Sequence, residues 1–316
     1  MTTRMVFLDR NSLPVPLPDF PFPHQLIDYE ETAPEALLSR CIDAEVLIVN
    51  KVRLGRELLQ QLPRLKLIAV AATGVNNVDL GACHDLGISV CNVRHYGDET
   101  VAEHAFMLLL ALFRNLPHYL QSVRNGEWSQ SRQFCLYDAP LRDLAGSCLV
   151  IVGSGGIGQA LATRARAFGM NVQFAERRGR GTPRAGFCTF EEGLSRADAL
   201  SLHCMLTPET RGLIGAAEFA AMKPGAILIN TARGELVDEP ALLAALCSGR
   251  LGGAGLDVLS QEPPIPDAEL PVCQLSNLIV TPHVAWASQQ AMTRLARQVV
   301  DNVAAFLAGE PRNLVV

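Results

Sequence analysis

The sequence predicts an α/β protein with two doubly wound parallel sheets. Apolar segments of strand length recur along the 316-residue chain and alternate with helix-like segments, a pattern typical of βαβ units. The length and a hydrophobic content of 49% favour two cores over one. A glycine-rich turn begins the second series of strands. We expect one domain to be made from both ends of the chain and the other to be inserted between them.

The first series of apolar segments predicts five strands, at residues 4–9, 26–30, 44–50, 65–72 and 88–92. The segments between them, such as APEALLSRC and LGRELLQQL, place Leu and Ala at i, i+3 and i+4, which indicates amphipathic helices. Residues 13–24 contain five prolines and therefore predict an extended loop.

A long helix is predicted at residues 99–124. It is apolar around much of its circumference, so we expect it to pack between domains, between subunits or both. The second series of strands is predicted at residues 147–153, 171–176, 197–204, 226–232, 253–258 and 278–283, and a last helix at 288–309.

The turn LVIVGSGGIGQALA (149–162) places Gly153, Gly155 and Gly158 between an apolar strand and a helix. Tight helix–strand packing alone can select glycine. In a dinucleotide-binding turn the first glycine permits the bend, the second lets a pyrophosphate approach the backbone and the third packs helix against strand. The strand before and the helix after the turn favour dinucleotide binding.

An acidic residue is expected about 20 residues beyond such a turn, where it binds the adenosine ribose. Glu176 ends the next predicted strand, 23 residues after Gly153 (176 minus 153). Its carboxylate would repel a 2′-phosphate, which favours NAD. However, Arg177 and Arg178 follow directly and can bind a 2′-phosphate, so NADP remains the alternative cofactor.

Reactive side chains follow the later strands: Arg233, Asp257, Glu262 and His283. Each alone has a structural explanation, as a surface ion pair, a loop cap or a hydrogen-bonded histidine. Together they offer a cation for a carboxylate, an imidazole that moves a proton and an acid that tunes the imidazole. Because ligands of open α/β sheets bind at the carboxyl ends of strands, we expect these side chains to lie beside a nicotinamide.

The sequence resembles the D-isomer-specific 2-hydroxyacid dehydrogenases, and within them the glycerate dehydrogenase/hydroxypyruvate reductase type. The resemblance covers almost the whole chain and is carried by residues 72–80, 101–112, 153–162, 202–214, 230–239, 255–264 and 281–288. It implies a Rossmann NAD(P)-binding domain at residues 99–284. This domain would be inserted into a flavodoxin-like substrate domain made of residues 1–98 and 285–316.

The resemblance implies hydride transfer between NAD(P)H and a small 2-keto acid, of the glyoxylate or hydroxypyruvate type, to give a D-2-hydroxy acid. Arg233 would bind the substrate carboxylate and polarise the C2 carbonyl. His283 would act as general acid and base. Glu262 would hydrogen-bond the other ring nitrogen of His283 and favour the cationic imidazole.

The resemblance also implies binding residues. The substrate carboxylate would meet the main-chain N–H groups of Gly74 and Val75, together with Arg233. Asp257 is expected to accept from the nicotinamide carboxamide. The full set of expected cofactor contacts is Gly153, Gly155, Gly156, Ile157, Gly158, Glu176, Arg177, Cys204, Pro208, Thr210, Thr231, Ala232, Arg233, Asp257 and His283.

Bulk properties exclude several function classes. A net charge of −5 and a pI of about 5.8 argue against nucleic-acid or anionic-membrane partners. The longest apolar run, residues 105–113, is too short to span a bilayer, and no secretory signal is recognised. Nine cysteines without zinc-like spacing predict reduced thiols and no metal. We expect a cytoplasmic enzyme and, from the resemblance and the apolar helix, a homodimer.

Three related functions are weighed as alternatives. Formate dehydrogenases carry a glutamine beside the catalytic histidine, and Glu262 argues against them. A phosphoglycerate dehydrogenase-like activity is a second possibility, although many such enzymes carry a C-terminal regulatory domain. A non-catalytic, NAD-binding corepressor-like protein is the third, and it would be expected to carry long interaction tails.

Overall fold

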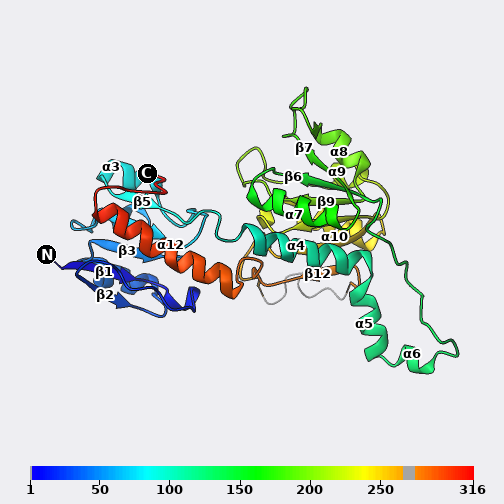
Figure 1. The fold of residues 1–316 in the computed structure, drawn as a ribbon, viewed down its shortest axis with the longest axis horizontal. Helices are drawn as coiled ribbons and strands as arrows, with labels where there is room; N and C mark the ends of the chain where they lie inside the picture. The colour runs from blue at the N-terminus through cyan, green and yellow to red at the C-terminus, as the bar shows by residue number, and fades with distance from the viewer. Residues whose placement is uncertain (1, 266–274) are drawn as a thin grey trace. The chain divides into compact units, whose positions relative to one another are not determined.

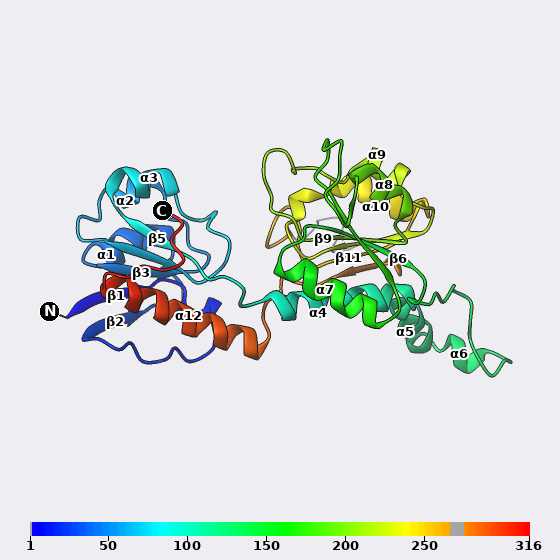
Figure 2. The same ribbon diagram turned by 45° about the horizontal axis from the view of Figure 1, so that its top comes forward.

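The structure, a computed structural model, describes residues 2–265 and 275–316. It divides into two compact units (Figure 1). Unit 1 comprises Met1–Gly97 and Ala287–Val316, and unit 2 comprises Asp98–Trp286. Each unit contains one sheet of parallel strands with interleaved helices (Figure 2), so the predicted α/β fold class is confirmed.

Unit 1 contains a five-stranded sheet in the order β2-β1-β3-β4-β5, which is the flavodoxin-like order. Its strands are β1 (Thr3–Phe7), β2 (His24–Asp28), β3 (Val46–Val49), β4 (Leu67–Val70) and β5 (Ser89–Cys91). Its helices are α1 (Leu37–Cys41), α2 (Arg56–Leu59), α3 (Leu80–Leu86) and α12 (Gln289–Leu307). Helix α12 comes from the far end of the chain and contacts β4.

Unit 2 contains a seven-stranded sheet in the order β12-β11-β10-β9-β6-β7-β8. Counted from β6, this is the Rossmann order 3-2-1-4-5-6 with one strand added. The strands are β6 (Cys148–Val152), β7 (Asn171–Ala175), β8 (Phe187–Cys188), β9 (Ala199–Leu202), β10 (Ala226–Asn230), β11 (Leu251–Leu256) and β12 (Leu278–Val280). Only β8 was not predicted, because two residues are too short for a pattern.

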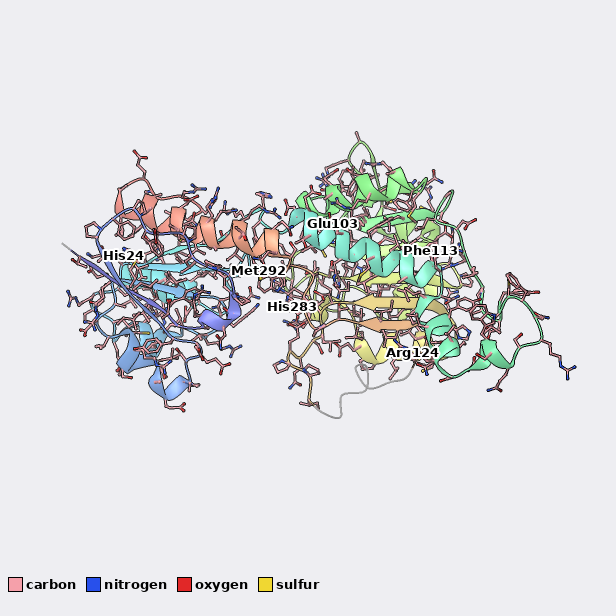
Figure 3. The ribbon with its side chains drawn as sticks, turned by 60° about the horizontal axis from the view of Figure 1, so that its bottom comes forward. His24, Glu103, Phe113, Arg124, His283 and Met292 are labelled. Atoms are coloured by element: carbon pink, nitrogen blue, oxygen red, sulfur yellow. The ribbon has the colours of Figure 1, made fainter. Side chains whose placement is uncertain are left out.

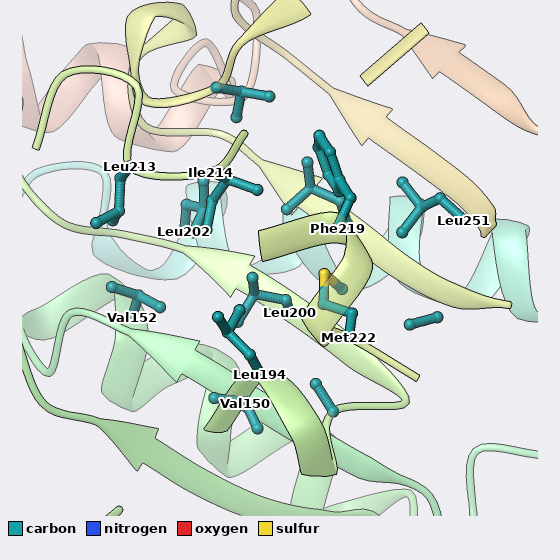
Figure 4. Close-up of a cluster of buried hydrophobic side chains, with 14 of the residues drawn as sticks. Val150, Val152, Leu194, Leu200, Leu202, Leu213, Ile214, Phe219, Met222 and Leu251 are labelled. Atoms are coloured by element: carbon teal, nitrogen blue, oxygen red, sulfur yellow. The ribbon is translucent and has the colours of Figure 1, made fainter. Parts of the chain in front are cut away.

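The described helices that flank this sheet are α4 (Asp98–Phe113), α7 (Gly156–Ala167), α8 (Phe190–Arg196), α9 (Ala216–Ala221) and α10 (Glu239–Cys247). Between α4 and β6 the chain forms α5 (Leu116–Arg124) and α6 (Glu127–Gln130). Val150 and Leu228 lie in the hydrophobic cluster that contains residues of α8, α9 and α10 (Figure 4). Leu149 and Ile227 lie in the cluster formed with α4 and α7. Because successive side chains of a strand point to opposite faces, a sheet covered on both sides needs apolar residues throughout.

The helix predicted at residues 99–124 is in fact two helices, α4 and α5. Asn115 adopts a left-handed conformation (φ 47°) between them, and Pro117 lies in the first turn of α5. Proline is tolerated there because the first turn of a helix leaves its N–H groups unpaired. As a result α5 and α6 extend away from the sheet of unit 2 (Figure 1).

The remaining fold predictions concern irregular and membrane-spanning segments. Of the predicted loop at residues 13–24, residues 13–23 contain no helix or strand, as predicted, whereas His24 begins β2. Among the described residues, no helix combines the length and hydropathy that crossing a bilayer requires.

Candidate active site

The predicted site residues of unit 2 follow strands of one parallel sheet. The glycine turn follows β6, Glu176 follows β7 and Cys204 follows β9. Arg233, Asp257 and His283 come soon after β10, β11 and β12, which are neighbours in the sheet. Figure 3 shows His283 in the loop beyond one end of this sheet. Since all strand pairs are parallel, these residues share the carboxyl edge, where open α/β sheets bind ligands.

The three glycines of the turn have two different physical roles. Gly153 has φ 110°, and a Cβ there would lie 2.5 Å from the His203 carbonyl oxygen. A Cβ on Gly158 would lie 2.1 Å from the Gly153 oxygen. A Cβ on Gly155 would meet nothing within 4 Å. Packing therefore requires the first and third glycines, whereas the second has open space beside it; at the next residue, Gly156, a Cβ would lie 1.9 Å from the Asp98 carboxylate.

Three buried polar side-chain atoms have no hydrogen-bond partner among the described residues, and besides Gln173 Oε1 on β7 two of them lie at the carboxyl edge of the sheet. These two are Thr231 Oγ1 and His203 Nδ1, which follow the adjacent strands β10 and β9. Burial lowers the pKa of His203 to about 4, so its ring is neutral at physiological pH. Buried polar groups without partners are rare and costly. Polar groups of a dinucleotide would satisfy them, and the residues present therefore fit such a cofactor.

Glu176 already has an internal partner. Its carboxylate is 1% exposed and accepts from Arg184 Nε at 2.6 Å and from the Arg184 main-chain N–H at 3.0 Å. Arg180 lies 3.7 Å away. The Arg184 hydrogen bond lowers the pKa of Glu176 to about 2. The predicted contact between Glu176 and a ribose stays a prediction, while the neighbouring Arg177 is exposed.

The loop after β9 is shaped by its own threonines. Thr210 Oγ1 accepts from the Thr207 N–H at 2.7 Å and donates to the Met205 carbonyl at 2.8 Å. Burial raises the pKa of the Cys204 thiol, which keeps it protonated. Cys204, Pro208 and Thr210 thus lie in one compact loop, and their predicted cofactor contacts remain predictions.

Asn230 shapes the turn that carries Arg233. Its side chain accepts from the Ala232 N–H at 3.0 Å and donates to the Arg233 carbonyl at 2.8 Å. The Arg233 guanidinium donates to the Ala232 carbonyl at 2.7 Å. Within residues 2–265 and 275–316, no carboxylate lies at ion-pair distance from Arg233. The remaining N–H groups can therefore bind a carboxylate from a ligand.

His283 and Glu262 form the short contact predicted from the sequence. His283 Nδ1 lies 2.5 Å from Glu262 Oε2, and Glu262 Oε1 accepts from the Leu259 N–H at 2.8 Å. The two side chains are 31% and 33% exposed. Glu262 orients the imidazole through Nδ1, so Nε2 is the nitrogen left for a ligand.

The Arg233 turn packs directly against the loop of Glu262. A Cβ on Gly234 would lie 1.9 Å from the carbonyl carbon of Leu259, so only glycine fits beside Arg233. The N–H of Leu259 also donates the hydrogen bond that Glu262 Oε1 accepts. Arg233, which follows β10, therefore lies in a turn that packs against the loop of Glu262, and Glu262 in turn contacts His283.

Asp257 is buried beneath His283, with 1% of its surface exposed. Its carboxylate accepts from the N–H groups of Val284 at 3.0 Å and Ala285 at 2.8 Å, and from the Thr281 hydroxyl at 2.6 Å. These bonds fix the turn in which His283 adopts φ 53°, a left-handed conformation rare outside glycine. The predicted contact of Asp257 with a carboxamide stays a prediction.

In unit 1, the loop that carries Gly74 and Val75 is fixed at both ends. Thr73 donates from its hydroxyl to the Val93 carbonyl at 2.8 Å, and Asn77 donates to the Val52 carbonyl at 3.0 Å. The N–H groups of Gly74 and Val75 donate to no acceptor in the part of the chain that the structure describes. Such a run of free N–H groups is suited to binding an anion.

Sequence reasoning missed His104, Asn230, Arg184 and His203, whose Nδ1 has no partner among the described residues. His104 and His203 lie inside the motifs at residues 101–112 and 202–214. A polar residue within an otherwise apolar segment was the signal that could have identified them. Among the described residues, no group of three His, Cys, Asp or Glu side chains is arranged to hold a metal ion.

A Rossmann sheet with an open glycine turn, beside a histidine–glutamate pair and a guanidinium, defines a dinucleotide-dependent oxidoreductase. The chain belongs to the D-isomer specific 2-hydroxyacid dehydrogenase family. The model of the NAD-binding domain of this family matches residues 106–285.

Named relatives and solved structures cover nearly the whole chain. The glycerate dehydrogenase of Methylorubrum extorquens is 50% identical over 100% of this chain and 99% of that protein. The hydroxypyruvate reductase of Blautia hydrogenotrophica is 37% identical over 89% of this chain and 88% of that protein. A D-lactate dehydrogenase from Aquifex aeolicus, complexed with NAD and lactic acid, is 29% identical with a TM-score of 0.83 and 99% coverage of both chains. An acyclic imino acid reductase in complex with NADPH and D-Arg is 26% identical with a TM-score of 0.85, covering 99% of this chain and 100% of that chain.

The same substitution at two glycines should separate packing from cofactor binding. Gly158→Ala should destabilise the protein by about 1–3 kcal/mol, because the new Cβ meets backbone. Gly155→Ala should leave thermal unfolding unchanged and raise the Kd for NADH at least about tenfold, a loss of roughly 1.4 kcal/mol. Differential scanning calorimetry and NADH fluorescence titration measure the two effects. Wild-type NADH affinity in Gly155→Ala would show that no pyrophosphate lies against this glycine.

Proposed function

We propose that this enzyme reduces glyoxylate and hydroxypyruvate to the corresponding 2-hydroxy acids, giving D-glycerate from hydroxypyruvate. The names of the glycerate dehydrogenase and hydroxypyruvate reductase relatives support this substrate class. A glyoxylate reductase of Thermococcus litoralis, 40% identical over 87% of this chain, supports it as well. The observation that carries the proposal is the 2.5 Å contact between His283 and Glu262, beside Arg233, which has no carboxylate at ion-pair distance among the described residues.

The residues at this edge have complementary roles in the proposed reaction. Arg233 holds the substrate carboxylate with two parallel N–H bonds and polarises the C2 carbonyl. His283 donates a proton from Nε2 to the C2 oxygen during reduction and takes it back during oxidation. Glu262 keeps the ring oriented and stabilises its cation. A bound nicotinamide supplies or accepts the hydride that C2 gains or loses.

In unit 1, we assign Gly74 and Val75 to the substrate carboxylate as well. Their free N–H groups support this role, because main-chain donors bind an anion without adding a charged side chain that must be desolvated.

For the cofactor, we propose that both NADH and NADPH are accepted. The glycine turn from Gly153 to Gly158 would hold the pyrophosphate, and Thr231 and Ala232 would line the nicotinamide end. The carboxylate of Glu176 is neutralised by Arg184 and is buried, so it repels a 2′-phosphate weakly. The exposed Arg177 is a cation at the same strand end.

We further propose that the chain forms a homodimer through the apolar surface of α4, α5, α6 and the segment after α6. Exposed apolar side chains gather there: Met107, Leu116, Leu120, Val123, Trp128, Phe134, Tyr137 and Leu141. A cavity of about 650 Å³ lies between α4 and α7 and is lined by Phe106, Met107, Leu110 and Phe168. Exposed apolar patches of this kind mark interaction sites.

Light scattering tests the dimer directly. The wild-type protein should have twice the 34.2 kDa mass of one chain, and Leu120→Glu should reduce that mass to one chain's. A wild-type mass of one chain at micromolar concentration contradicts the proposal.

We assign the protein to the cytoplasm. The eight described cysteines are all free thiols, and several are buried, which suits a reducing compartment. The net charge of −5 argues against a nucleic-acid partner, and the small anionic substrate would be bound by a local cation, Arg233.

Two alternatives have specific discriminators. A D-3-phosphoglycerate dehydrogenase of Methanocaldococcus jannaschii is 36% identical, but the match covers only 53% of that protein. Activity with 3-phosphoglycerate above that with glycerate would favour this alternative. A corepressor-like protein would bind NADH and consume none of it with any 2-keto acid.

Replacing the proton donor should abolish turnover without preventing cofactor binding. His283→Gln should lower kcat for hydroxypyruvate reduction by about 10²–10⁴-fold with an unchanged Kd for NADH. Glu262→Gln should lower kcat by a smaller factor, because its one amide oxygen can still accept from Nδ1, although the amide carries no charge and its NH2 group cannot accept from the Leu259 N–H. Stopped-flow NADH absorbance measures both rates, and Glu191→Gln on the exposed face of α8 is the control. A fully active His283→Gln variant contradicts the assignment.

Removing the partner of Glu176 should change the cofactor preference. Wild-type kcat/KM values for NADH and NADPH should differ by less than about tenfold. In Arg184→Met the freed carboxylate should repel the 2′-phosphate and lower kcat/KM for NADPH at least about tenfold, with a small effect on NADH. Arg196→Met, which removes only an exposed ion pair with Glu192, is the matched control. An unchanged cofactor ratio in Arg184→Met shows that Glu176 does not face the ribose.

A further inference from the structure

One histidine outside the proposed catalytic set reaches the buried carboxylate beneath His283. His104 lies in the middle of α4, with its side chain 16% exposed. Its Nε2 atom is 2.9 Å from Thr281 Oγ1 and 3.5 Å from Asp257 Oδ1. The buried residues of α4 around it are apolar, so this imidazole is a polar group in a hydrophobic helix face.

The direction of these hydrogen bonds is determined by counting hydrogens. The Thr281 hydroxyl has one hydrogen, and it donates this hydrogen to Asp257 at 2.6 Å in preference to the Leu256 carbonyl at 3.4 Å, because the carboxylate is closer and charged. It therefore accepts from His104, whose Nε2 must carry a proton. The chain of donation runs from His104 to Thr281 to Asp257.

Asp257 is also hydrogen-bonded to the turn that carries His283. Its two oxygens accept the N–H groups of Val284 and Ala285, and its main-chain carbonyl accepts the N–H of His283 at 2.9 Å. The indole of Trp286 donates to the His283 carbonyl at 3.0 Å. His283 is held in a left-handed conformation by bonds on both sides, and such a conformation persists only where its surroundings determine it.

We propose that His104 is a positioning residue for His283. It acts through Thr281 and Asp257, and keeps the imidazole of His283 at the orientation needed for proton transfer. The proposal rests on the proposed function of His283 as general acid and base. Small displacements of a catalytic group cost large factors in rate, so a residue that touches no substrate can control kcat.

Two substitutions at position 104 test the proposal. His104→Phe keeps the ring and removes the donor, and should lower kcat for hydroxypyruvate reduction about 10–100-fold with an unchanged KM for NADH. His104→Gln places an N–H the same number of bonds from the main chain and should recover most of this loss. Thr281→Val interrupts the same chain, so the double variant with His104→Phe should lose little more than either single variant. His84→Phe, at an exposed site in unit 1, is the matched control.

An NMR measurement distinguishes failure of this proposal from failure of the proposed function on which it rests. With 15N-labelled histidine, the ring resonances of His283, assigned by comparison with His283→Gln, should shift in His104→Phe and return in His104→Gln. This readout applies even if no 2-keto acid is reduced, an outcome that would refute the proposed function alone. Unmoved His283 resonances in His104→Phe overturn the positioning role, as does a wild-type kcat in that variant or a loss that His104→Gln fails to recover.

Discussion

The buried carboxylate of Asp257 is the interaction on which the geometry of the site depends. Burying a charged group is costly unless hydrogen bonds replace its hydration. Here the replacement donors are a hydroxyl from Thr281 and two main-chain N–H groups directly after His283. The requirement to satisfy one carboxylate therefore fixes the backbone that carries the imidazole. Each donor left without this partner would cost about 1–3 kcal/mol, so alternative conformations of the turn are disfavoured.

The parallel sheet places the other proposed catalytic side chains beside the turn that carries His283. Strands β10, β11 and β12 are paired in register, from Asn230 to Leu256 to Val280, so the segments that follow them begin side by side. Gly234 allows the Arg233 turn to touch the loop of Glu262 without a gap. A cation, an acid and an imidazole from distant parts of the sequence thus share one edge, and the open Gly155 lies at the same edge for the cofactor.

Most of the fold and part of the site could be predicted from the sequence. Strands such as β6 and β10 are buried on both faces and read as unbroken apolar runs, and the glycine turn marks where a helix follows. The contact between His283 and Glu262 was predicted through the family resemblance. The break at Asn115 was missed, although Pro117 two residues later was a signal in the sequence for the start of a new helix. Arg184 as the partner of Glu176, and His104 as a donor toward Asp257, depend on tertiary contacts that no spacing rule encodes.

Single-turnover hydride transfer in Asp257→Asn tests the central claim most directly. The amide has nearly the size of the carboxylate, but in either orientation its NH2 group faces one of the two main-chain donors, Val284 or Ala285, and cannot accept from it. If the carboxylate fixes the His283 turn, the variant should fold, bind NADH and transfer hydride to hydroxypyruvate at least about 100-fold more slowly, since misplacement of a catalytic group by about 1 Å has an effect of this size. A wild-type rate of hydride transfer would contradict the claim.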